Sequence, residues 1–128
     1  MAERTIVIDG VERKMRASAL IPRLYRYHFH RDIIRDMTQL RRGFEKAQSI
    51  PDGATLEERE DAELSSVDLE IFENIAWLML RHAGEDIPDS PDAWLDSIDG
   101  VFGVYDIMPI VLELWGENQI TTSTPKKK

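Results

Sequence analysis

The side chains best suited to chemistry are three histidines and a large number of carboxylates. The histidines are His28, His30 and His82. His28 and His30 lie two residues apart, and residues at that spacing do not share a helix face, so they cannot chelate one metal ion together. The sequence also contains no His-Glu-x-x-His motif, no glycine-rich phosphate loop and no cysteine. We therefore expect no metal site and no cofactor.

The carboxylates do not form a recognisable catalytic set. The chain has 24 Asp and Glu residues, so close pairs arise by chance. Neither Asp32 with Asp36 nor Asp96 with Asp99 indicates general acid–base catalysis by itself. The acidic run 57–63 lacks the spacing of a calcium-binding loop. We expect a protein that is not an enzyme. The alternative is a hydrolase, which a metal-dependent activity lost on changing Asp96 or Asp99 would favour.

The first element that could position such residues is a β-hairpin. Asp9-Gly10 separates two short alternating segments, and this dipeptide favours a type I′ turn. The pattern predicts strands at about residues 4–9 and 11–16. Because a lone hairpin is marginally stable in water, it must pack on helices or pair with the edge of another chain. Self-association into a homo-oligomer is therefore also an expectation.

The rest of the chain has helical patterns. A continuous apolar stripe predicts one long helix from Pro22 to about Ala47; its members are Tyr25, Phe29, Ile33, Met37, Leu40 and Phe44. Opposite charges from Arg31 to Asp36 are expected along its exposed side. Further helices are predicted from Ser65 to about Ala83, where Gly84 ends the helix, and from Ser90-Pro91 through Ile98. A last helix, ended by Gly116, either begins near Ile107 or is kinked at Pro109.

These elements predict an α+β fold, mostly α, with an N-terminal hairpin and about four helices in a single domain. The domain is expected to cover residues 1–118. It includes an acidic linker at 48–64, where Thr55 and Glu58 have the spacing of a capping box. Residues 119–128 are expected to form a flexible basic tail, because Pro125 and three lysines do not continue a helix.

Charge is distributed unevenly along the chain. The net charge is -8, yet residues 1–48 carry 11 basic against 6 acidic residues, and residues 49–125 carry 2 against 18. The polarity reflects either solvated faces that partly neutralise each other or two surfaces for two partners. Nucleic acid is not an expected partner, because phosphate binding favours a net basic protein. No apolar run approaches the ~20 residues that a bilayer crossing needs, so no membrane partner is expected.

Several apolar side chains have two alternative roles. Core packing is one, and helix-to-helix binding of a partner is the other, because tryptophan is common at interface hot spots. The candidate partner-binding residues are Tyr25, Phe29, Trp77, Leu114 and Trp115.

Four segments resemble a known family. They are Ala17–Arg26 with Phe29 and Arg31-Asp32-Ile33, then Asp68–Ala76, then Trp94-Leu95, and finally Ile107-Met108-Pro109 with Leu112–Trp115 and Asn118. In this order they resemble the tail assembly chaperones of long-tailed phages and prophages of Gram-positive bacteria. The likeness spans almost the entire chain. It departs at His30, where a small residue such as glycine is expected in relatives.

The resemblance implies a scaffold in the host cytoplasm. Such chaperones bind the tape measure protein, recruit tail tube subunits, and are absent from the mature virion. They commonly exist as a short form and a longer form made by programmed frameshift. Lys126, Lys127 and Lys128 could be encoded by an A-rich slippery site; a solubilising tail explains them equally well. The alternative function is a small phage or bacterial regulator that acts by protein–protein binding.

Overall fold

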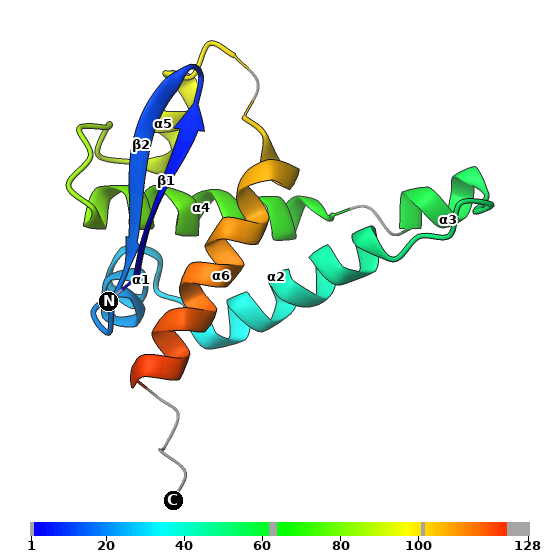
Figure 1. Ribbon diagram of the computed structural model, residues 1–128, viewed down its shortest axis with the longest axis horizontal. Helices are drawn as coiled ribbons and strands as arrows, with labels where there is room; N and C mark the ends of the chain where they lie inside the picture. The colour runs from blue at the N-terminus through cyan, green and yellow to red at the C-terminus, as the bar shows by residue number, and fades with distance from the viewer. Residues whose placement is uncertain (1, 62–63, 101, 123–128) are drawn as a thin grey trace, which may run out of the picture.

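The order of elements is a hairpin followed by helices, as Figure 1 shows for the computed structural model. The structure describes residues 2–61, 64–100 and 102–122. The elements in this part are β1 (Ala2–Ile8), β2 (Val11–Ala17), α1 (Ile21–Phe29), α2 (Ile33–Gln48), α3 (Leu56–Asp61), α4 (Ser66–His82), α5 (Pro91–Asp96) and α6 (Val104–Thr122). The expected α+β class, mostly α, is confirmed. None of the helices in the described ranges combines the length and apolar character of a bilayer-crossing segment.

The hairpin forms where the turn signal places it. Asp9 and Gly10 have φ values of 54° and 78°, the left-handed conformation that a type I′ turn needs at both positions. The antiparallel register runs from Ile8 opposite Val11 to Ala2 opposite Ala17. One face of this two-stranded sheet carries buried residues such as Met15, and the other is solvated. The strands thus confirm the predicted ribbon, with small shifts at their ends.

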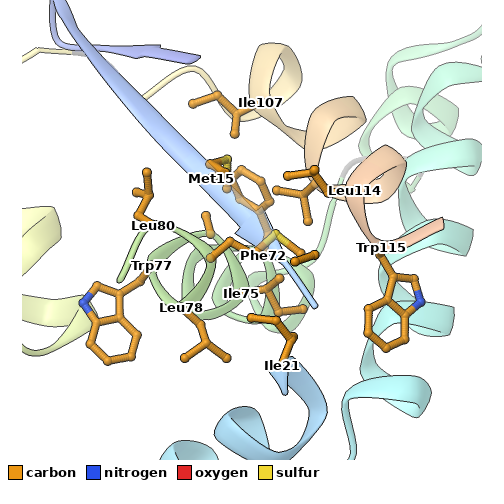
Figure 2. Packing of buried hydrophobic residues seen from close by; sticks show 14 of the residues in the cluster. Met15, Ile21, Phe72, Ile75, Trp77, Leu78, Leu80, Ile107, Leu114 and Trp115 are labelled. Atoms are coloured by element: carbon orange, nitrogen blue, oxygen red, sulfur yellow. The ribbon is translucent and has the colours of Figure 1, made fainter. Parts of the chain in front are cut away.

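Helix α4 is the centre of the core. Ser65 caps it in a capping box with Asp68, and Gly84, at φ 86°, follows its C-terminal cap as expected. Every residue from Ile75 to Leu80 is buried, because β2, α1, α2, α5 and α6 all pack around this helix. A helix that is apolar on all sides is typical of such a central position. Figure 2 shows Phe72 and Ile75 of α4 and Met15 of β2 within this cluster.

The predicted long helix from residue 22 to 47 is wrong, because the chain bends between α1 and α2. His30 caps α1 in the left-handed conformation, with φ 56° and ψ 38°. Asp32 then caps α2 by accepting a hydrogen bond from the Ile34 N–H. The bend does not expose the apolar stripe, because its members in α1 and in α2 are all buried or partly buried. Periodicity therefore identified the buried face but not the break.

The start of helix α6 excludes one of the two predicted alternatives, and its end differs from the prediction. It begins at Val104, which excludes a start near Ile107, and it contains Pro109, the alternative for which a kink was expected. Because proline has no N–H, the helical hydrogen bond to the carbonyl of Tyr105 is missing there. It continues through Gly116 to Thr122, so residues 119–122 are helical where a loose tail was expected. Gly116 does not take the left-handed φ that ends helices. Packing of α6 on β1, β2, α2 and α4 outweighs the weak helix propensity at this end.

Candidate protein-docking surface

The histidines do not converge on a common site. His28 and His30 are exposed on α1 and at its end, and His82 is half-buried at the end of α4. Among residues 2–61, 64–100 and 102–122, no three His, Cys, Asp or Glu side chains are grouped so that they could hold a metal ion. Asp96 and Asp99 are both exposed beside α5, and the backbone N–H of Asp99 donates to Asp9 at 3.1 Å. In that contact Asp9 holds the hairpin turn to the segment after α5.

One nucleophile–base pair is present, between Ser18 and His82. The Ser18 hydroxyl lies 2.8 Å from Nε2 of His82. Burial, helped by the charge of Arg16, lowers the pKa of the His82 ring, which keeps the imidazole neutral near pH 7. In the described part of the chain, however, no carboxylate bonds the other ring nitrogen, as an orienting group would in a catalytic triad. Ser18 also accepts the Leu20 N–H at 3.2 Å, so the pair ties the start of α1 to the end of α4.

Most of the apolar residues predicted as candidates for partner binding lie in the core. Tyr25, Trp77, Leu114 and Trp115 are at most 3% exposed, and Phe29 is partly buried against the cluster. In Figure 2, Trp77 and Trp115 lie on opposite sides of the packed side chains. The Trp77 indole donates to the Pro88 carbonyl at 2.9 Å, which satisfies its one polar group. For these four buried residues the structure favours the core-packing alternative.

The bend between α1 and α2 is held by a buried carboxylate. Asp36, only 2% exposed, accepts a hydrogen bond of 2.7 Å from the Tyr25 hydroxyl. It also accepts a fork from Arg31, with Nε at 2.7 Å and Nη2 at 2.8 Å. The expected placement of this charge pair on an exposed helix side is therefore wrong for Asp36. After the bend, residue 36 turns toward Tyr25 of α1, so the carboxylate joins both helices.

The electrostatics of this cluster favour the ionised carboxylate. Burial alone would raise the pKa of Asp36, but hydrogen bonds from Arg31 and Tyr25, together with the charges of Arg31 and Arg35, lower it below its usual value. Burial and the neighbouring Asp36 raise the pKa of the Tyr25 hydroxyl, so this group stays protonated and continues to donate. The negative charge of Asp36 is thus balanced by Arg31 and by the hydrogen bond from Tyr25. Because Tyr25 belongs to α1 and Asp36 to α2, these bonds fix the direction of α2 relative to α1.

Beside the hydrogen-bonded cluster of Tyr25, Arg31 and Asp36, three adjoining hollows follow the same side of α1 and α2. The first has a volume of about 510 Å³ and is lined by Pro22, Arg26, His30, Arg31, Asp32, Ile33 and Ile34. The second is lined by Arg31, Asp32, Arg35, Asp36 and Gln39. The third is lined by Arg35, Thr38, Gln39 and Arg42. Each hollow shares two residues with the next, so together they form one continuous track.

We call this track the basic strip and define it by Arg26, His30, Arg31, Arg35 and Arg42. The three hollows are lined by four arginines and by two carboxylates, Asp32 and Asp36, so basic residues are in excess. Within the described ranges, the side chains of Arg26, Arg35 and Arg42 form no hydrogen bond or ion pair, and all three residues are exposed. Arg35 acts on Asp36 through its charge alone. These three guanidinium groups are therefore free to bind carboxylates of another polypeptide in the bidentate geometry that arginine favours.

One exposed apolar side chain accompanies the strip. Ile34, which lines the first hollow, is 58% exposed. The sequence reasoning missed it, because it does not fall on the apolar stripe from Tyr25 to Phe44. The signal available was an isoleucine directly beside the stripe member Ile33. Arginines beside an exposed apolar residue suit a partner that is both acidic and amphipathic.

The lysines predicted to adjoin a frameshift site, Lys126, Lys127 and Lys128, lie outside the described residues. Comparisons of the chain with protein-family models, with curated proteins and with solved structures gave no match.

Proposed function

We propose that this protein is a non-enzymatic tail assembly chaperone that binds the tape measure protein and recruits tail tube subunits. Two lines of reasoning support the proposal. The first is the ordered resemblance of four segments to that family. The second, which carries the proposal physically, is the basic strip with its unpaired arginines and exposed Ile34.

The chemistry of the strip suggests how a partner would bind. An amphipathic helix could place carboxylates against Arg26, Arg35 and Arg42 and an apolar residue against Ile34. Exposed ion pairs each contribute about 0.2–1 kcal/mol, so three of them with one apolar contact give modest affinity. Modest affinity suits a chaperone, since its partner must be released when tail tube subunits assemble.

A pull-down with the tape measure protein and the tail tube protein tests the proposal. The wild-type chain should retain the tape measure protein, and the double variant Arg35→Glu with Arg42→Glu should lose most of that retention. Lys14→Glu is a single charge-reversal control, because Lys14 is exposed on β2 and lines none of the three hollows. Retention of neither partner by the wild-type chain would count against the chaperone.

The genes around this one provide a second test. A tail tube gene upstream and a very long gene downstream are expected, as is a minus-one reading frame that stays open past the lysine codons. A neighbourhood without tail genes would favour the alternative, a small regulator that uses the same strip for another protein.

A further inference from the structure

The second unusual feature of the surface is a projecting acidic segment. Helix α3 extends beyond the C-terminal end of α2 in Figure 1, away from the body of the molecule. Within the described ranges, it makes no substantial packing contact with any other helix or strand. Isolated helices shorter than about 12–15 residues are marginally stable in water. A helix of 6 residues without a packed face therefore gains stability if something covers it.

Local hydrogen bonds nevertheless give this segment a defined shape. The Thr55 N–H donates to the Glu58 carboxylate at 3.0 Å, and the Glu58 N–H donates back to the Thr55 hydroxyl at 3.1 Å. The Arg59 guanidinium donates to the Asp52 carbonyl at 3.0 Å, which closes the loop before the helix. We call residues 50–61 the acidic arm. Because its shape is already fixed, docking would lose less conformational entropy than ordering a free loop.

The arm carries the negative charge that would complement the basic strip. Residues 50–61 contain five acidic residues and one basic residue, a formal charge of -4. Leu56 is 72% exposed, and in the described part of the chain Glu57 is exposed and unpaired. The strip offers the unpaired guanidinium groups of Arg26, Arg35 and Arg42, and the exposed Ile34 lines the same hollow as Arg26. Both surfaces thus combine an apolar residue with charges, and the charges have opposite sign.

We propose that the acidic arm of one copy of this chain docks on the basic strip of a second copy. In Figure 1 helix α3 of the arm lies beyond one end of α2. The residues of the strip lie on α2 and α1 and between these two helices. Since every copy carries both surfaces, reciprocal exchange closes a two-fold symmetric pair. The proposal rests on the role of the strip as a protein-docking surface but not on the identity of the tape measure protein as its partner. An incoming acidic helix would then have to displace the arm.

Sedimentation velocity of the full chain over a wide concentration range tests this pairing without any phage protein. The wild-type chain should dimerise, and added salt should weaken the dimer. An arm variant, Glu57→Arg, and a strip variant, Arg35→Glu with Arg42→Glu, should each weaken self-association about tenfold, because attraction becomes repulsion. The altered side chains are exposed, and circular dichroism verifies that each variant folds. Lys14→Glu, a single charge reversal outside both surfaces, should leave the dimer unchanged.

Mixing the two variants gives the decisive measurement. In a mixed pair, the unaltered arm of the strip variant meets the unaltered strip of the arm variant, and the two reversed surfaces meet each other. The mixture should therefore dimerise more tightly than either variant alone. A wild-type chain that stays monomeric would overturn the pairing, as would a mixture no tighter than its components or an equal effect of Lys14→Glu. A monomeric chain whose strip binds a single-stranded oligonucleotide would assign the strip to nucleic acid instead.

Discussion

Arg31 binds Asp36 through two parallel hydrogen bonds, from Nε to Oδ2 at 2.7 Å and from Nη2 to Oδ1 at 2.8 Å. The carboxylate is buried, whereas the arginine is 52% exposed. Arg31→Ala should lower the free energy of unfolding by about 1–3 kcal/mol, because it leaves a buried acceptor without its charged donor. Chemical denaturation measures this loss. Arg35→Ala removes a nearby unpaired arginine and should change stability by less than about 0.5 kcal/mol.

The hydroxyl of Tyr25 predicts a loss of stability in alkali. Burial and Asp36 raise its pKa above the usual value of about 10, so above that pH the unfolded chain loses the proton while the folded chain keeps it. The unfolded state then binds fewer protons, and stability falls as pH rises. Tyr25→Phe should flatten this slope in denaturation curves measured above pH ~10.

His82 predicts a loss of stability in mild acid. Burial and the charge of Arg16 lower its pKa, so the unfolded chain binds a proton first as pH falls below about 6.5. Stability should therefore decrease from that pH downward, toward the folded pKa. His82→Gln should reduce the slope between pH ~7 and ~5. Equal slopes in wild-type and His82→Gln proteins would show that His82 is not the group responsible.

His30 lies at a backbone position that favours glycine. Its φ of 56° places it in the left-handed region, which is unfavourable for a residue with a Cβ by about 1–2 kcal/mol. Glycine removes that strain but loses more entropy on folding, so His30→Gly should raise the free energy of unfolding by up to about 1 kcal/mol. His30→Val should lower it. Thermal and chemical denaturation of the two variants should therefore shift in opposite directions.

Trp94 should be among the most important core residues. Its side chain is 3% exposed, and its ring meets that of Phe102 edge-on at a centroid distance of 5.3 Å. Trp94→Ala should lower the free energy of unfolding by about 3–5 kcal/mol, because it leaves a large cavity. Tyr27→Ala provides the exposed aromatic control. A loss below about 1 kcal/mol for Trp94→Ala would contradict its place in the core.

Local signals in the sequence predicted the type and order of most elements. Asp9-Gly10 identified the hairpin, Ser65 and Gly84 bracketed α4, and Ser90 with Pro91 began α5. These signals succeed because each depends on a few neighbouring residues. The bend at His30 was missed, because histidine gives no sign of a left-handed conformation and the apolar period continues across it. At Gly116 a local signal predicted a helix end that the structure does not have, because tertiary packing keeps this residue helical.

The candidate docking surface was less predictable than the fold. Residues chosen for their apolar character, such as Trp77 and Trp115, are buried because the same period that suggests a binding face also describes a core. The basic strip depends on the bend, which brings Arg26 of α1 and Arg31 around one hollow. Since a sequence pattern contains no information about that bend, it could show an excess of arginine but not the surface those side chains form.

The ion pairs of Arg4 with Glu113 and Glu117 connect the two ends of the described chain. During translation β1 is made roughly ten seconds before its α6 partner, at ordinary rates of synthesis. Throughout that interval the inner face of the hairpin lacks part of its cover. The nascent polypeptide must therefore avoid premature association of its own apolar surface before the last helix arrives.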